Sequence, residues 1–268
     1  MDYCFSLAHL TVLDLPPHEA VGVAARAGYS HVGVRLLPAA PGGAAYPLTE
    51  PALLRETQAA LSDTGLGVFD LEIIRLAPDT NVAGFRGFCE TGAALSAKAV
   101  LVAGDDPDEA RLTDRFAAFC ELAAPYGLTA DIEFMPWTEV PNLSKALRVV
   151  RNAGQPNGGV LVDALHFFRS DSHLAELATI PREWLHYAQV CDAPAETPTT
   201  HEGLIHAARA ERLFPGEGDL DIVAMMRPLP RDLPVSLEIP TATLARTVGH
   251  EERARRALAA ARAVLAPL

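Results

Sequence analysis

Short apolar runs alternate with amphipathic segments along almost the whole chain. Eight apolar runs have the length and composition of β-strands: 3–8, 31–36, 67–74, 98–103, 128–134, 159–163, 185–191 and 234–239. Amphipathic segments at 17–27, 49–64, 81–96, 109–125, 142–153, 171–179 and 248–265 predict helices. Glycines at 28, 65, 127 and 154 stand where C-terminal helix caps are expected. Continuously apolar strands separated by helices predict a parallel sheet covered by those helices.

Eight strand–helix units in 268 residues are typical of a (β/α)8 TIM barrel, here a single domain over 1–268. The alternative is an open doubly wound sheet. That fold usually has a glycine-rich phosphate turn after its first strand, and LAHLTVLDLP has none. Two proline-rich stretches, 36–51 and 191–204, are expected to be long loops after the second and seventh strands. Such loops build the active sites of barrels.

Four polar residues interrupt the most apolar parts of the chain, each just before a strand-like run ends. They are Glu133 in DIEF, Asp163 in VLVDAL, Gln189 in YAQVCD and Glu238 in SLEIP. One such residue alone is explained by a hydrogen-bonded strand end. In a barrel, however, the four strand ends meet at one mouth, and unpaired carboxylates are costly to bury. We therefore expect the four side chains to share one divalent cation.

Three carboxylates and one amide oxygen form a hard, all-oxygen ligand set. This set favours Mn²⁺ or Mg²⁺. Co²⁺ and Zn²⁺ are alternatives, and Zn²⁺ is less favoured because it prefers nitrogen and sulfur ligands. A divalent ion bound to hydroxyl and carbonyl oxygens of a substrate acidifies the carbon-bound proton between them. Glu133 and Glu238 would flank the metal as catalytic acid or base, and Asp163 would be a ligand only.

Several motifs resemble those of the xylose isomerase-like TIM barrel superfamily. DALH (163–166) is similar to its DxxH motif, AQVCD (188–192) to its HxxD motif, RLFPGEGDLDI (212–222) to its R-x-x-PGEG segment and SLEIP (236–240) to its last strand. The superfamily contains sugar isomerases, ketose 3-epimerases, hydroxypyruvate isomerases, inosose dehydratases and 3-dehydroshikimate dehydratases. The resemblance covers essentially the whole chain and implies a metal-dependent enzyme without specifying its reaction.

Gln189 stands where this superfamily usually has histidine. Members with hydroxypyruvate isomerase, inosose dehydratase or dehydroshikimate dehydratase activity often carry glutamine here, whereas ketose epimerases and the endonuclease IV branch carry histidine. The endonuclease branch needs further histidines, which His9 and His31 do not supply. The net charge of −12 would also repel nucleic acid and anionic membranes. We therefore expect a small-molecule substrate, with no nucleic-acid or membrane partner.

The resemblance also assigns two residues beside the metal. It makes His166 a substrate contact that could carry a proton, and the alternative is a hydrogen-bonded structural histidine. It makes Arg212 a substrate-binding residue, and the alternative is a surface salt bridge. Trp137 follows Glu133 closely enough to form an apolar wall beside the metal, although ordinary loop packing explains it equally well.

Further candidates close the first three predicted strands. Arg35 and Arg75 end the second and third strands, and if they point inward they form a basic pocket for a carboxylate or phosphate. The structural alternative is an ion pair between Glu72 and Arg75. His9 ends the first strand, with structural and substrate-binding roles both open. The candidate substrate-binding residues are thus Arg212, Arg75, Arg35, His9, Glu72 and Trp137.

The first hypothesis is a divalent-metal-dependent isomerase or epimerase that acts on a small sugar or hydroxy-carbonyl compound through an enediolate. The second is a dehydratase, a lyase acting on a keto-polyol or a 3-dehydroshikimate-like acid. The third is a non-catalytic sugar-binding barrel, which has no need of two flanking glutamates. We expect a cytoplasmic protein, because no apolar run of about 18 residues predicts a membrane span and the N-terminus lacks a basic signal region. Families that the chain resembles are commonly homodimers or homotetramers.

Overall fold

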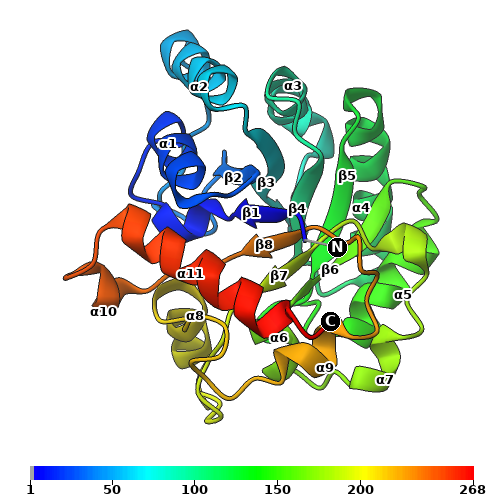
Figure 1. The fold of residues 1–268 in the computed structure, drawn as a ribbon. Helices are drawn as coiled ribbons and strands as arrows, with labels where there is room; N and C mark the ends of the chain where they lie inside the picture. Colours follow the sequence, from blue (N-terminus) through cyan, green and yellow to red (C-terminus); the bar gives the residue numbers. More distant parts are fainter. Residues whose placement is uncertain (1–2) are drawn as a thin grey trace.

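The structure, a computed structural model, describes residues 3–268. Its strands pair in parallel in sequence order, and the last pairs with the first, so that the sheet closes into a barrel (Figure 1). The strands are β1 (Phe5–Leu7), β2 (His31–Arg35), β3 (Gly67–Leu76), β4 (Ala99–Gly104), β5 (Thr129–Glu133), β6 (Gly158–Asp163), β7 (Ala188–Val190) and β8 (Val235–Leu237). The predicted (β/α)8 barrel is confirmed.

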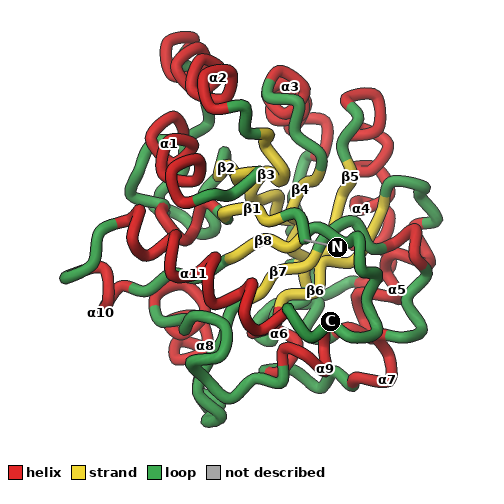
Figure 2. The backbone as a smooth tube through the Cα atoms, viewed as in Figure 1, coloured by secondary structure: helices red, strands yellow, loops and turns green. Residues whose placement is uncertain are grey.

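Helices surround this barrel on its outside, and Figure 2 distinguishes them from the central strands. The α-helices are α1 (Pro17–Ala27), α2 (Pro51–Thr64), α3 (Arg86–Ala94), α4 (Glu109–Ala123), α5 (Leu143–Ala153), α6 (Ala164–Phe168), α7 (Leu174–Leu177), α8 (His201–Ala210), α9 (Ile222–Met226), α10 (Ala242–Ala245) and α11 (His250–Leu265). Short 3-10 helices cover His9–Val12, Val82–Phe85, Ala124–Tyr126 and Arg182–Trp184. Among residues 3–268, no helix has both the length and the apolar composition to cross a bilayer.

The sequence-based expectation missed helix α8, as well as the short helices α6, α9 and α10. The stretch 191–204 was expected to be a loop, yet α8 begins within it at His201. Thr200 caps this helix, because its hydroxyl accepts a hydrogen bond from the Gly203 amide at 3.0 Å. The predicted helix caps at Gly28, Gly65 and Gly154 are confirmed, since all three have positive φ angles after α1, α2 and α5.

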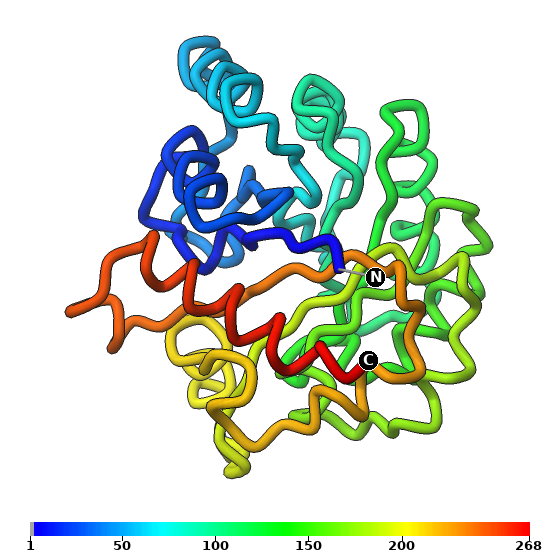
Figure 3. Tube along the Cα trace, viewed as in Figure 1, coloured from blue at the N-terminus to red at the C-terminus, as the bar shows by residue number. Residues whose placement is uncertain are grey.

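The main core lies between the barrel and its helices. Alternation along β8 illustrates its origin, since Val235 and Leu237 belong to that outer core while Ser236 between them faces the barrel interior. Figure 3 shows how the two ends of the chain complete the ring, with α11 beside α1. The Tyr29 hydroxyl fastens them by donating to the Ala254 carbonyl oxygen at 3.0 Å. Along each strand, the residues that alternate with those of the outer core point into the barrel, toward its axis.

Candidate metal centre

The four polar residues predicted to bind a metal lie together at the carboxyl end of the barrel. Glu133 and Asp163 end β5 and β6, Gln189 lies in β7, and Glu238 directly follows β8. Asp163 and Gln189 are register partners on neighbouring strands. All four side chains are buried, with residue exposures of 0–3%. The polar positions in the apolar runs thus converge because the parallel strands end at one mouth.

His166 joins this group through the local fold after β6. Helix α6 begins directly after Asp163, whose Oδ1 accepts a hydrogen bond from the His166 amide at 3.0 Å. This turn places His166 Nε2 3.6 Å from Glu133 Oε1 and 4.0 Å from Asp163 Oδ1. Ligand atoms of Glu133, Asp163 and His166 all lie within 4.8 Å of one another. His166 therefore has the position of a metal ligand as well as that of a substrate contact.

Several donor atoms at this mouth are buried without a partner. Glu133 Oε1 and both amide atoms of Gln189 form no hydrogen bond within the described part of the chain. Burial, with the nearby Glu238 and Asp163 carboxylates, raises the pKa of Glu133 well above its usual value. Burial also raises the pKa of Glu238 to about 7, against the lowering effect of Arg212. Desolvated oxygen atoms with excess negative charge are the environment that a divalent cation requires, so the residues present fit one.

Arg212 lies inside this cluster of carboxylates. Its Nη1 atom donates to Asp163 Oδ2 at 2.8 Å, and its Nη2 lies 2.7 Å from Glu238 Oε2. The Nε atom donates to the Ala208 carbonyl oxygen at 2.8 Å, which fixes the plane of the guanidinium. Arg212 is only 2% exposed, so the surface salt bridge that the sequence left open as an alternative is ruled out. Arg212 neutralises part of the negative charge of the site.

Asp192 anchors the loop that carries Arg212. Its carboxylate accepts hydrogen bonds from the amides of Ala193 and Gly216 at 2.8 Å each, and of Leu220 at 3.1 Å. Gly216 belongs to the PGEG segment. Asp192 therefore caps the loop and does not contact the metal candidates.

Arg35 and Glu72 form a second buried ion pair at the mouth. Arg35 Nε donates to Glu72 Oε2 at 2.7 Å, and the His9 amide donates to Glu72 Oε1 at 3.2 Å. His9 Nδ1 accepts from the Arg35 amide at 2.8 Å, while its Nε2 donates to the Leu15 carbonyl oxygen at 3.0 Å. His9 therefore holds Arg35 in place, in keeping with the structural alternative, and it is not among the residues that line the cavity described below.

Arg75 pairs with a different residue from the one considered in the sequence. Its Nε lies 2.7 Å from Asp105 Oδ2 and its Nη2 donates to Asp105 Oδ1 at 2.8 Å, so the pairing of Glu72 with Arg75 is wrong. The physical reason is the register, because Glu72 is the partner of Arg35 on β2 and the β3–β4 register is irregular between Leu71 and Ile74.

A small cavity of about 30 Å³ lies among these residues. Trp137 forms one wall, and its ring meets that of His166 edge to face with centroids 5.1 Å apart. The full lining is Leu10, Arg35, Ala39, Ile73, Arg75, Leu101, Glu133, Met135, Trp137, His166, Ala208, Arg209, Arg212 and Glu238. Five of the six candidate substrate residues thus lie at or beside this cavity. Glu72 is beside it, bonded to Arg35, whereas His9 lies behind Arg35.

Arg209 is a functional candidate that the sequence reasoning missed. It lies in α8, one helical turn before Arg212, and it lines the cavity. Within residues 3–268 it forms no ion pair, and its one hydrogen bond is a long one, from Nη2 to the Ala39 carbonyl oxygen at 3.4 Å. Burial lowers its pKa, and Arg75 and Arg35 lower it further. Arg209 is therefore a partly buried cation that lacks an anion.

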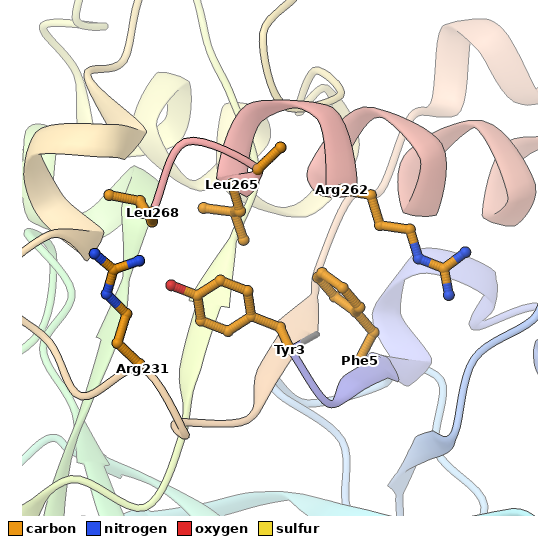
Figure 4. Close-up of a pocket in the computed structure, with 7 residues that line it drawn as sticks. Tyr3, Phe5, Arg231, Arg262, Leu265 and Leu268 are labelled. Carbon is orange, nitrogen blue, oxygen red and sulfur yellow. The ribbon is translucent and has the colours of Figure 1, made fainter. Parts of the chain in front are cut away.

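A larger cavity lies elsewhere, at the opposite end of the barrel (Figure 4). Tyr3, Phe5, Arg231 and Arg262 are among its lining residues. None of its lining residues is an aspartate, glutamate, histidine or cysteine. The smaller cavity at the mouth is the better candidate active site, since ionisable groups converge there.

The comparisons with known proteins agree with this geometry. The profile of the family described as xylose isomerase-like TIM barrel matches residues 21–264. The chain belongs to this family. The match covers β2 to β8 and therefore every metal candidate, as the sequence motifs predicted.

Two curated relatives are enzymes of different classes. The chain is 31% identical over 136 residues to a 3-dehydroshikimate dehydratase from Pseudomonas aeruginosa, covering 49% of this chain and 21% of that protein. It is 26% identical over 158 residues to an inosose isomerase from Halalkalibacterium halodurans, covering 54% of this chain and 53% of that protein. The chain thus spans about a fifth of the dehydratase and about half of the isomerase.

Solved structures share the fold at lower identity. The IolI protein with a bound zinc atom has a TM-score of 0.81 at 18% identity, covering 98% of each chain. A D-allulose 3-epimerase from Methylomonas sp. has a TM-score of 0.71 at 16% identity, covering 99% of this chain and all of that chain. At these identities the likeness establishes the barrel fold and no more.

Proposed function

We propose that this chain is a divalent-metal-dependent lyase that removes water from a small hydroxylated oxo acid. The observation that carries the proposal is that one cavity is lined both by an unpartnered carboxylate oxygen and by a cation that lacks an anion. Glu133 supplies that oxygen and Arg209 is that cation, while the unpartnered amide of Gln189 is buried in β7, at the same end of the barrel. The net charge of −12 supports a small-molecule substrate rather than nucleic acid.

Glu133, Asp163 and His166, whose ligand atoms lie within 4.8 Å of one another, would hold the metal, and the buried Gln189 and Glu238 would complete its ligand set. When bound, a divalent cation supplies Lewis acidity toward a carbonyl oxygen and so acidifies the neighbouring C–H group. Mn²⁺ and Mg²⁺ suit the oxygen donors, and Zn²⁺ becomes more competitive if His166 is a ligand.

Glu133 is best placed to take the proton from that carbon. Its carboxylate has two oxygens, so one can bind the metal while the other accepts the proton, and Oε1 has no hydrogen-bond partner among residues 3–268. The residue also lines the cavity, whereas Glu238 is engaged by Arg212 at 2.7 Å. Burial favours the protonated form of Glu133, which makes its carboxylate a stronger base than one in water. The electron pair of the broken C–H bond forms the new C=C bond, and the hydroxyl on the next carbon leaves. Glu133 returns the proton to this hydroxyl, which departs as water.

His166 would position the leaving hydroxyl. Burial lowers the pKa of His166 to about 4, so the ring is neutral at neutral pH. Its Nδ1 atom has no hydrogen-bond partner in the described chain, and the ring lines the cavity. A neutral imidazole there can hydrogen-bond the substrate without adding charge to the site.

Arg209 indicates the acidic substrate. The other three arginines of the mouth are already neutralised: Arg35 by Glu72, Arg75 by Asp105, and Arg212 by Asp163 and Glu238. A substrate carboxylate would be the missing partner of Arg209, the one arginine of the mouth that has no anionic partner among the described residues. This feature, with the likeness to the Pseudomonas dehydratase, supports our choice of elimination over isomerisation, which was the first hypothesis from the sequence.

The test is turnover by the metal-loaded protein of 3-dehydroshikimate, compared with neutral ketoses and hydroxypyruvate. We expect an unsaturated product from the oxo acid, and a reduction of roughly 10²–10⁴-fold in kcat for Glu133→Gln. Glu183→Gln, an exposed glutamate in the 3-10 helix before β7, is the matched control. Full activity of Glu133→Gln would remove Glu133 from the role of base.

An isomerase is the second candidate, because the inosose isomerase matches 54% of the chain. Both reactions begin with the same proton transfer to Glu133. In the lyase reaction the hydroxyl then leaves, whereas in the isomerase reaction it stays, so analysis of the product distinguishes the two reactions. A ketose converted to its isomer or epimer, with the oxo acid untouched, would favour the isomerase and contradict the lyase.

A further inference from the structure

A second group of polar side chains lies inside the barrel, one level beneath the metal candidates. In TIM barrels, alternate strands supply the four side chains of each interior layer. Asp70 of β3, Asp131 of β5 and Tyr187 directly before β7 each stand two residues before a residue of the mouth, which puts them one level below it, and Ser6 comes from β1, the remaining alternate strand. Apolar branched residues usually fill these layers, so four polar ones require a physical reason.

Asp131 has its partners and Asp70 does not. Asp131 accepts from Thr129 Oγ1 at 2.8 Å and its Oδ1 lies 2.6 Å from His186 Nδ1. Asp70 is fully buried, and neither carboxylate oxygen has a hydrogen-bond partner among residues 3–268. Burial raises the pKa of Asp70 well above its usual value, and its next-largest influences are the negative charges of Glu72 and Glu238.

Hydroxyl groups without partners surround the same level. Ser6 Oγ, Ser236 Oγ and the Tyr187 hydroxyl are all buried and unbonded within the described chain. Ser6 and Ser236 are direct register partners on β1 and β8. Tyr187 packs against Phe69, the neighbour of Asp70 on β3, with ring centroids 5.2 Å apart, and burial together with the charge of Asp70 raises the pKa of Tyr187.

Gly33 leaves space beside the buried carboxylate of Asp70 because it has no side chain. A Cβ atom at Gly33 would stand 3.1 Å from both Asp70 oxygens, so a side chain there would crowd that carboxylate. The hydroxyls and the carboxylate do not reach one another, yet all are removed from solvent. Such groups need an occupant between them, and the negative charge of Asp70 needs a cation.

We propose that Asp70, Ser6, Ser236 and Tyr187 form an internal binding site for a monovalent alkali cation, separate from the divalent metal site above it. One carboxylate and three hydroxyl oxygens are hard donors suited to Na⁺ or K⁺. Their single negative charge is balanced by a single positive one, whereas a divalent ion would leave a net charge in the barrel core. The site would stabilise the barrel and screen Asp70 from Glu72 and Glu238.

The experiment compares thermal unfolding of the divalent-metal-loaded protein in KCl, NaCl and tetramethylammonium chloride at equal ionic strength. An alkali cation at about ten times its Kd should raise Tm by roughly 4 °C over tetramethylammonium. Asp70→Asn keeps the shape and removes the charge, so its Tm should not depend on the cation. Asp131→Asn is the matched control from the same layer, and it should keep the cation dependence.

Crystals of the wild-type protein grown with Tl⁺ in place of K⁺ provide a second measurement that needs no variant. We expect an anomalous peak between Asp70 and the Tyr187 hydroxyl. Equal Tm values in all three salts, or water molecules alone between these residues, would overturn the proposal. Neither result bears on the lyase reaction, because stability and anomalous scattering are measured without substrate.

Discussion

The Nη1 atom of Arg212 lies 2.8 Å from Oδ2 of Asp163, and both side chains are buried. Asp163 is therefore held by a guanidinium on one oxygen, while its other oxygen accepts the amide of His166. A metal ligand held at both oxygens has little rotational freedom. This arrangement pre-organises the site, because the ligand loses little entropy on binding a metal.

Replacing Arg212 by methionine should destabilise the metal-free protein by about 3–5 kcal/mol, because Asp163 and Glu238 would remain buried without their cation. Saturating divalent metal should recover part of this loss. Urea unfolding with and without metal measures both effects. Arg256→Met is the control, since Arg256 pairs with Glu252 at an exposed position and should change stability by about 0.5 kcal/mol or less. Equal losses in the two variants would contradict the buried role of Arg212.

Stability should depend on pH through Glu238 and Glu133. In the folded protein the pKa of Glu238 is about 7, above its ordinary value of 4.5, so the folded state binds this proton more tightly than the unfolded chain does. Metal-free protein should therefore lose stability as the pH rises from about 4.5 to about 7. The pKa of Glu133 is raised too and acts in the same direction.

Divalent metal should reverse this trend, because it replaces the protons. The increase in Tm caused by metal should be larger at about pH 8 than at about pH 5, as a pH series of thermal unfolding would measure. Glu238→Gln should flatten the trend, while an exposed variant such as Glu183→Gln should leave it unchanged. A metal-induced shift that is the same at both pH values would show that these carboxylates do not bind the metal.

Replacing Arg209 by glutamine should raise KM for an acidic substrate by roughly 10–150-fold, the loss of one charge-assisted hydrogen bond. The effect on kcat should be smaller, since Arg209 does not contact Glu133 or His166 in any hydrogen bond or ion pair of the described chain. Steady-state kinetics with an acid and with its neutral amide measure the difference. Arg227→Gln, at the exposed end of α9, is the control. An equal effect on acid and amide would contradict recognition of a carboxylate.

Gly159 tests the packing beneath the site. A Cβ atom there would stand 2.5 Å from Asp131 Oδ1 and 2.6 Å from His186 Nδ1, separating a bonded pair. Gly159→Ala should destabilise the barrel by about 1–3 kcal/mol, measured by urea unfolding. Gly87→Ala in α3 has no atom within 4 Å of its added methyl group and should stabilise by up to about 1 kcal/mol. No loss in Gly159→Ala would show that the interior tolerates larger side chains.

The barrel and the four metal candidates could be predicted because both follow from local pattern. A single polar residue stands out at the end of an apolar strand, so it can be recognised in the sequence. Closure of the barrel then brings Glu133, Asp163, Gln189 and Glu238 together. Family motifs added His166 and Arg212, which the structure places beside these carboxylates.

Ion-pair partners could not be predicted, because they depend on register. The register irregularities on both sides of β3 decide that Glu72 meets Arg35 and that Arg75 meets Asp105. Arg209 was missed because residues 205–210 were assigned no helix, although its spacing from Arg212 is one helical turn. Asp70 was also missed because of register. The register shifts near it on β3, so it points inward beside the apolar Phe69, which regular alternation does not predict.

Metal analysis of the purified protein tests the central claim most directly. Protein dialysed against Mn²⁺ and then against metal-free buffer should retain about one equivalent of divalent metal per chain, and Asp163→Asn should retain far less. Chelator should remove both this metal and the activity, and added metal should restore them. A protein that retains no metal, and whose activity is unchanged by chelator, would contradict a metal centre formed by Glu133, Asp163, Gln189 and Glu238.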